Sequence, residues 1–184
     1  HRPVWSTLHA ALAGGDLYRW LLNSVLITVA SVLVSTAVAA LAAYPISLMR
    51  WRPGPIVLSV LIALMVVPPI VLIVPLFQEV ANLQQLNTYQ AVIVIYTGVL
   101  LPFSTFLLAS FFDTIPRSLI EAARIDGASS LRTFRFVVIP LSLPTLMTVV
   151  VVQALWVWNE VLIALVFLQE SNLRTLMVGL TVYQ

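Results

Sequence analysis

Glu121-Ala122-Ala123-Arg124-Ile125-Asp126-Gly127-Ala128 is the stretch around which the rest of this chain is organised. It lies in a polar segment, residues 113–135, between very apolar runs. A polar segment in that position must face water. Arg117, Glu121 and Arg124 fall at i, i+4 and i+7, so on a helix they share one face. The spacing predicts a short helix that presents charge to a partner.

The same segment carries signals for helix ends. Pro116 is placed to open the helix, where its missing N–H costs nothing, and Gly127 is placed to end it in a left-handed cap. Either serine of the pair 129–130 can cap a second helix, which runs to Pro140. The sequence therefore predicts two short helices at an angle, joined by a turn.

These residues resemble a known loop. The pattern Glu-Ala-Ala-x-x-Asp-Gly-Ala at 121–128, then Phe134 and Ile139-Pro140-Leu141-x-x-Pro144, is similar to the EAA loop of membrane subunits of bacterial ABC importers. Flanking motifs narrow the resemblance to the sugar-type permeases, like the smaller membrane subunit of a maltose importer. Those motifs are Asn23-Ser24, Ala42-Ala43-Tyr44 followed by Arg50, Leu86-Asn87-Thr88, Trp158-Asn159-Glu160 and Thr175-Leu176-Met177-Val178-Gly179.

The resemblance implies an all-α polytopic membrane protein with the core of a type I ABC importer permease (MetI-like). It covers nearly the whole chain, so residues 1–184 are expected to form a single permease domain. Relatives have six spans, of which four are visible here, and the chain begins with His1 rather than Met. We therefore expect a fragment.

Composition supports a membrane protein independently of the resemblance. Hydrophobic residues make up 61% and charged residues 9%, and the mean hydropathy is +1.05, far from the values of soluble domains. All nine basic residues are Arg, and without Lys a phosphate-binding P-loop is impossible. Cys is absent and the two His lie outside the apolar runs. We expect no enzyme activity, cofactor or metal site in this chain, and ATP hydrolysis by another chain.

Apolar runs predict four membrane spans at about 20–49, 55–78, 89–112 and 141–168. Between the third and fourth lies the predicted coupling segment, residues 113–139. In the first span, small residues recur at every fourth position and favour close helix packing. They are Ser31, Ser35, Ala39 and Ala43. Packing within the subunit is favoured over an interface with a partner subunit.

Two features suggest a substrate pathway. Prolines 68 and 69 interrupt the second span, as in the broken helices of transport sites, although an ordinary proline kink explains them equally well. Gln153, Trp156 and Glu160 share one face of the fourth span, beside Asn159. A carboxylate there is costly, about 2.5–3.5 kcal/mol for Asp on insertion scales, and so indicates function.

A Trp beside polar groups suits a sugar, since the aromatic face packs on C–H groups while amides and carboxylates take hydroxyls. The alternative is an interfacial belt formed by Trp156 and Trp158, with Glu160 reaching outward. The pathway interpretation is slightly favoured.

Charge distribution predicts the orientation. Because four spans alternate sides, residues 49–54 and 113–139 share one side. That side holds six of the nine arginines, namely Arg50, Arg52, Arg117, Arg124, Arg132 and Arg135. The other side holds Arg2, Arg19 and Arg174. The positive-inside rule makes the arginine-rich side cytoplasmic, in what the resemblance implies is a bacterial inner membrane.

The resemblance also implies partners: a cytoplasmic ABC ATPase dimer, a second related permease subunit, an extracytoplasmic solute-binding protein and the lipid membrane, but no nucleic acid. In the coupling segment, Glu121 would contact the ATPase and Gly127 would set the angle between the helices. Asp126 would brace the turn, and Ala122 and Ala123 would allow close packing. Arg117, Arg124 and Ala128 complete the predicted coupling set.

Other functions are weighed against this interpretation. A secondary transporter or channel usually has ionisable residues in several spans, whereas only Glu160 qualifies here. A membrane-embedded enzyme would need a catalytic constellation that the chain lacks. Among ABC importers, a permease for amino acids, peptides or anions is the main alternative, but an anion route favours Arg near the span centres, and none is present.

Overall fold

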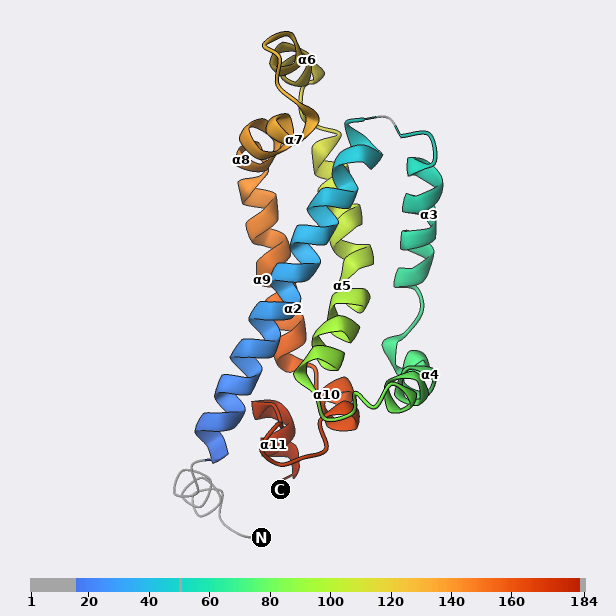
Figure 1. Cartoon of the computed structure of the whole chain (residues 1–184), viewed down its shortest axis with the longest axis vertical. Coiled ribbons are helices and arrows are strands. Elements are labelled where there is room, and N and C mark those ends of the chain that lie inside the picture. The colour runs from blue at the N-terminus through green and yellow to red at the C-terminus, as the bar shows by residue number, and fades with distance from the viewer. Residues whose placement is uncertain (1–15, 50, 183–184) are drawn as a thin grey trace. The chain divides into compact units, whose positions relative to one another are not determined.

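The computed structural model describes residues 16–49 and 51–182, which fold into helices joined by turns and short irregular segments. No strand occurs in these residues, so the predicted all-α class is confirmed (Figure 1). The elements are α2 (Asp16–Ser47), α3 (Gly54–Met65), α4 (Pro69–Asn82), α5 (Tyr89–Phe112), α6 (Arg117–Ile125), α7 (Ser130–Thr133), the π-helical η1 (Phe134–Val138), α8 (Ile139–Leu141), α9 (Leu143–Asn159), α10 (Leu162–Phe167) and α11 (Leu176–Val182). Arg2 and Arg50, used above for orientation, lie outside the described residues.

Among the described residues, two helices are by length and composition able to cross a membrane, namely α2 over Leu17–Ser47 and α5. The same residues give up to four spans if each bent helix pair counts as one. The helix α5 coincides with the predicted bounds 89–112. The predicted spans 55–78 and 141–168 are each divided. The first breaks between α3 and α4 because Pro68 adopts an extended conformation (ψ 132°) and Pro69 has no N–H to continue a helix.

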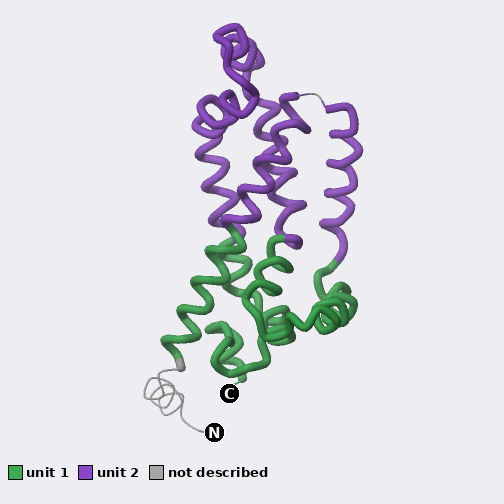
Figure 2. The backbone as a smooth tube through the Cα atoms, in the orientation of Figure 1, with its two compact units in different colours: residues 1–32, 68–97, 154–184 green, residues 33–67, 98–153 purple. Residues whose placement is uncertain are grey.

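The chain folds as two compact units, coloured separately in Figure 2. Unit 1 comprises residues 1–32, 68–97 and 154–184, and unit 2 comprises residues 33–67 and 98–153. The coupling segment belongs entirely to unit 2. Each unit is described by itself below.

In unit 2, the core forms from the small-residue face of α2 and from apolar side chains of α5, the coupling segment and α9. Ala39, Ala43 and Tyr44 of α2 are buried with Leu108 and Phe112 of α5. Ser35 of the predicted stripe is also fully buried here, as is Ser31 in unit 1. This supports the favoured interpretation, in which the stripe packs within the subunit.

In unit 1, hydrogen bonds connect α2 to the segment that precedes α11. The Asn23 amide donates hydrogen bonds to the carbonyls of Asn172 (2.9 Å) and Arg174 (3.0 Å) and accepts one from the Tyr89 hydroxyl (2.9 Å). Close by in the chain, Trp20 packs so tightly on Gly179 that a Cβ there would lie 2.2 Å from the indole ring. Only glycine fits this contact.

Candidate functional site

The first half of the coupling segment is a helix with a defined start and end. Pro116 lies immediately before α6, in an extended conformation (ψ 125°). At the other end, Gly127 has φ +78°. Its N–H donates to the Arg124 carbonyl (3.0 Å), and the Ala128 N–H donates to the Ala123 carbonyl (2.9 Å). These two bonds form a Schellman cap, so the predicted left-handed end at Gly127 is confirmed.

The second half begins at a serine, as predicted. The Ser129 hydroxyl accepts a hydrogen bond from the Arg132 N–H (3.4 Å) and so caps α7. The helical run continues through Leu141 and includes a π turn, Phe134–Val138. It then bends by 74° into α9. At the bend, the Val138 carbonyl accepts hydrogen bonds from both the Ser142 hydroxyl (2.7 Å) and the Ser142 N–H (3.0 Å).

Apolar anchors and one short hydrogen bond hold the coupling segment in unit 2. Ile120 of α6 is only 4% exposed and lies in the core cluster with Phe134. The Phe134 ring contacts the Tyr44 ring of α2 at a centroid distance of 5.1 Å. Next to Tyr44 along α2, the Ser47 hydroxyl donates to the Asp113 carboxylate (2.6 Å). The segment is therefore joined to the end of α2 rather than hanging from a flexible linker.

The charged face predicted for α6 is exposed. Arg117, Glu121 and Arg124 are open to solvent, and within the described residues none of them forms an ion pair or a side-chain hydrogen bond. Ala122 is exposed and Ala123 is half-buried. Asp126 closes α6 through its N–H, which donates to the Ala122 carbonyl (3.0 Å), whereas its side chain is exposed. These charges are free to pair with another protein.

Exposed apolar residues beside this face were missed by the sequence reasoning. Ile125 is 86% exposed, and Leu131 and Phe136 are also mostly exposed. The Arg135 guanidinium lies 5.8 Å from the centre of the Phe136 ring. The available signal was their helical register: these three positions fall outside the face that carries Ile120 and Phe134. Exposed apolar side chains within a polar segment favour a role in docking to a partner.

Among the predicted pathway residues, Gln153 lies in the core of unit 2. Its side chain is 1% exposed. The amide oxygen accepts from Thr36 (3.3 Å), and the amide nitrogen donates to Ser35 (3.3 Å) and to Ser104. All these partners belong to the same chain. The contacts favour a role in holding α2, α5 and α9 together within this unit.

Glu160 of unit 1 lies where α9 ends. One oxygen accepts from the Tyr96 hydroxyl (2.8 Å), and both oxygens accept backbone N–H groups at the start of α10, from Leu162 (2.8 Å) and Ile163 (3.0 and 3.1 Å). Tyr96 also meets the Trp156 ring edge-on, at 6.1 Å. The structure thus links Trp156 and Glu160 through Tyr96. The carboxylate satisfies amides that the interrupted helix would otherwise leave without partners.

The remaining predicted pathway residues have few contacts. The exposed Asn159 donates to the Leu155 carbonyl (2.7 Å), one turn back in α9. Pro68 is exposed and Pro69 is half-buried at the start of α4. Within the residues that the structure describes, no group of three or more His, Cys, Asp or Glu is placed to hold a metal ion.

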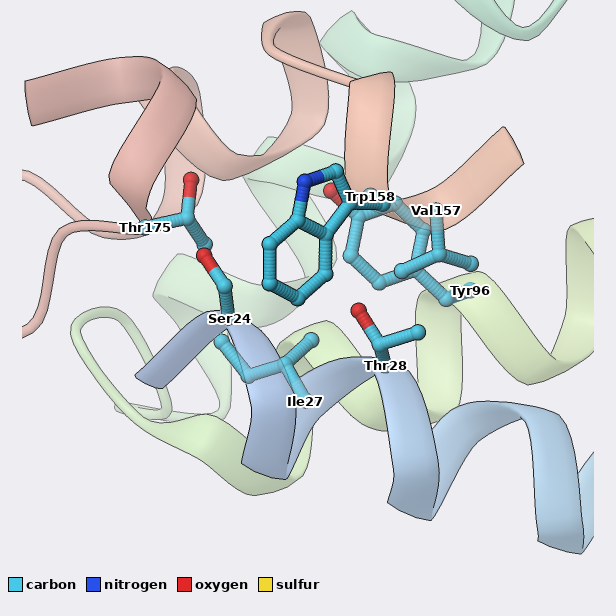
Figure 3. Close-up of a pocket in the computed structure, with 7 residues that line it drawn as sticks. All are labelled: Ser24, Ile27, Thr28, Tyr96, Val157, Trp158 and Thr175. Atoms are coloured by element: carbon cyan, nitrogen blue, oxygen red, sulfur yellow. The ribbon is translucent and has the colours of Figure 1, made fainter. Parts of the chain in front are cut away.

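A small pocket lies within unit 1 (Figure 3). Its walls come from α2, α5, the end of α9 and the residue before α11. Hydroxyls of Ser24, Thr28 and Thr175 line it together with the rings of Tyr96 and Trp158. Ile27 and Val157 complete the lining. Its side chains leave no enclosed space large enough for a water molecule.

Comparisons with known proteins agree with this architecture. Residues 35–183 match the model of the family described as binding-protein-dependent transport system inner membrane component. The chain is 35% identical over 184 residues to a sulfoquinovosyl glycerol transport system permease protein of Agrobacterium fabrum, covering 100% of this chain and 65% of that protein. It is 36% identical over 160 residues to a melibiose/raffinose/stachyose import permease protein of Bacillus subtilis. That match covers 86% of this chain and 58% of that protein.

A solved structure has the same fold. It is a chain of a bacterial ABC transporter involved in the import of the acidic polysaccharide alginate, with a TM-score of 0.84 and 25% identity. The match covers 97% of this chain and 62% of that chain. The present chain therefore spans less than two thirds of the length of these relatives. It belongs to the family of inner membrane components of binding-protein-dependent transport systems.

Proposed function

We propose that this chain is the permease component of an ATP-driven importer that moves a sugar or related polyol into the cytoplasm. Family membership supports a transport role. The relatives reported above are named for a sugar glycoside and for oligosaccharides, which supports the substrate class. The observation that carries the proposal is the coupling segment: a capped helix, fixed to its own core, with an unpaired charged and apolar surface.

Energy would come from a separate ATPase dimer in the cytoplasm. Closure of the dimer on ATP has to move the permease. A coupling segment fixed to its core at Ile120, Phe134 and Asp113 transmits the movement of the ATPase, whereas a flexible loop would absorb it. Glu121 would form the charged contact, with Arg117 and Arg124 beside it. Ala122, Ala123 and Ala128 would permit close approach. Ile125 would add an apolar contact.

The residues of the proposed substrate pathway favour a neutral substrate. The Glu160 carboxylate already accepts hydrogen bonds from Tyr96 and the start of α10, so it is not free to select a cation. Trp156 is partly exposed and offers an aromatic surface for the C–H face of a sugar. We further propose a second, related permease subunit and an extracytoplasmic binding protein as partners.

The experiment measures sugar uptake and ATP hydrolysis by the importer purified in complex with its ATPase and reconstituted in vesicles. Wild type should take up labelled sugar only when ATP is present on the ATPase side. Glu121→Lys reverses the contact charge, and Gly127→Pro imposes a negative φ where +78° is needed. Both variants should stay in the membrane but lose at least tenfold in uptake per ATP hydrolysed.

Glu79→Lys is the matched control, since Glu79 is an exposed carboxylate of α4 outside the coupling segment. It should keep uptake and hydrolysis coupled. Normal uptake by both coupling variants would remove the docking role. Uptake by wild type without ATP would instead indicate an ATP-independent transporter.

A further inference from the structure

The connection between α4 and α5 has an unusual backbone conformation. Among the described residues, Gln84 (φ 56°) and Asn87 (φ 58°) are the two non-glycine residues with positive φ. Asparagine tolerates this region better than most residues, because its short side chain can bond to nearby backbone groups. A residue that keeps such a conformation in a folded protein is held there by its surroundings. The contacts of Asn87 identify those surroundings.

Asn87 joins this connection to the C-terminal end of α10. Its side-chain oxygen accepts hydrogen bonds from the backbone N–H groups of Gln169 (2.7 Å) and Glu170 (3.3 Å). Its own N–H donates to the Phe167 carbonyl (3.0 Å). The Phe167 ring also lies 6.1 Å from the Phe77 ring of α4, centre to centre. This end of α10 is therefore fixed to α4 and to the residues that precede α5 (Figure 1).

The N-terminal end of α10 is fixed to α5 at a second point. There the Glu160 carboxylate accepts the Tyr96 hydroxyl (2.8 Å) as well as the first N–H groups of α10. Tyr96 follows Asn87 by nine residues, and Gln169 follows Glu160 by the same number. The two contacts pair these residues in opposite order. Because helical residues advance the chain by equal steps of about 1.5 Å, both contacts can form at once, and sliding of α10 along α5 would break both.

We propose that Asn87 is a positioning residue of the substrate pathway and acts through α10. It holds one end of this helix and thereby keeps Glu160 in place at the other end. Glu160 in turn fixes the hydroxyl of Tyr96, whose ring meets the Trp156 ring edge-on at 6.1 Å. Trp156 is the aromatic surface that the proposed function gives to the sugar, so the pathway role rests on that function. The two-point attachment of α10 does not depend on it.

Three variants separate the side-chain acceptor from the backbone conformation. Asn87→Gly adopts the positive φ without strain but removes the acceptor. Asn87→Asp keeps an acceptor oxygen and a residue type that tolerates this conformation. Gln84→Gly is the matched control, because Gln84 has a similar φ in the same connection, is exposed and has no side-chain hydrogen bond among the described residues. Asn87→Asp and Gln84→Gly should behave as wild type in both measurements that follow.

Amide hydrogen exchange of the importer, purified with its ATPase in lipid nanodiscs, measures the attachment of α10. Asn87→Gly should speed exchange about fivefold at residues 169–170, where the acceptor is lost, and also at residues 162–163. The second effect is expected because a helix released at one end opens as a unit. Faster exchange confined to residues 169–170 would reduce Asn87 to a local cap and overturn its positioning role.

ATP-driven sugar uptake by the same importer in vesicles measures the consequence for transport. In Asn87→Gly, the sugar taken up per ATP hydrolysed should fall about fivefold, the factor by which one hydrogen bond of ordinary strength shifts an equilibrium. ATP hydrolysis and recovery of the ATPase in co-purification should stay at wild-type values. Loss of stability alone would lower uptake and hydrolysis together and leave their ratio unchanged.

An unchanged ratio in Asn87→Gly, or an equal fall in Asn87→Asp, would overturn the proposal. If wild type takes up no sugar with ATP, the proposed function fails, and the pathway role fails with it. The exchange rates at residues 162–163 would still show whether Asn87 fixes α10, so the two failures are distinguishable.

Discussion

Gln153 illustrates how one neutral polar side chain can organise apolar helices. It occurs in a chain with no buried ion pair among the described residues, so its amide supplies directional contacts that leucines and valines cannot. The three hydroxyl partners come from α2 and α5 in unit 2. Since apolar side chains gain little from leaving lipid, packing and hydrogen bonds must hold such helices together.

We expect Gln153→Leu to lower the free energy of unfolding by about 1–2 kcal/mol, because the buried hydroxyls of Ser35 and Thr36 lose their hydrogen-bond partner. Reversible unfolding in mixed micelles with increasing SDS measures the change. Gln78→Leu, at an exposed position of α4, is the control and should stay within about 0.5 kcal/mol of wild type. Equal stability of the two variants would show that the cluster contributes nothing.

The roles of polar residues were harder to predict than their presence. Periodicity placed Gln153, Trp156 and Glu160 on one helical face, but a one-dimensional pattern does not say whether that face meets a cavity or a neighbouring helix. In the structure, Gln153 forms hydrogen bonds with three hydroxyl groups that lie 49 to 118 residues away in sequence. Glu160 accepts a hydrogen bond from Tyr96, which lies 64 residues away in sequence. Such long-range partners are decided by packing rather than by local sequence.

Among the elements, the coupling segment was predicted best. Its boundaries follow from local chemistry, since Pro116, Gly127 and Ser129 each restrict or satisfy the backbone within a few residues. The π turn at Phe134–Val138 and the bend at Ser142 were not predicted. Their backbone hydrogen bonds depend on how the segment is fixed against Tyr44, which no local motif encodes.

Two isoleucines of α6 separate anchoring from docking. Ile120→Ala removes a buried side chain and should cost about 2–5 kcal/mol of stability. Ile125→Ala removes one that is 86% exposed, so stability should change by less than about 0.5 kcal/mol. We expect the second variant to lower ATPase recovery in co-purification at least threefold. Unchanged recovery with Ile125→Ala would exclude an apolar contact at this position.

For the whole molecule, composition and apolar runs were sufficient to predict the class. Membership of an inner-membrane family together with long apolar helices confirms the predicted multi-pass location in the inner membrane. The count of continuous spans was less predictable. Hydropathy is averaged over a window of residues, so it detects neither the break at Pro68 nor the end of α9 at Asn159.

The proposed mechanism also depends on the orientation of the chain in the membrane. Because the sequence contains no Cys, a single introduced Cys can be labelled without background from other thiols of this chain. Ser118→Cys in α6 and Ser171→Cys before α11 form a matched pair of exposed, nearly isosteric substitutions. In membranes stripped of peripheral proteins, an impermeant maleimide should label Ser118→Cys only from the cytoplasmic side and Ser171→Cys only from the opposite side. This follows because arginines concentrate on the side of the coupling segment. Labelling of Ser118→Cys from the exterior alone would separate the segment from any cytoplasmic ATPase, and the proposed coupling would then be physically impossible.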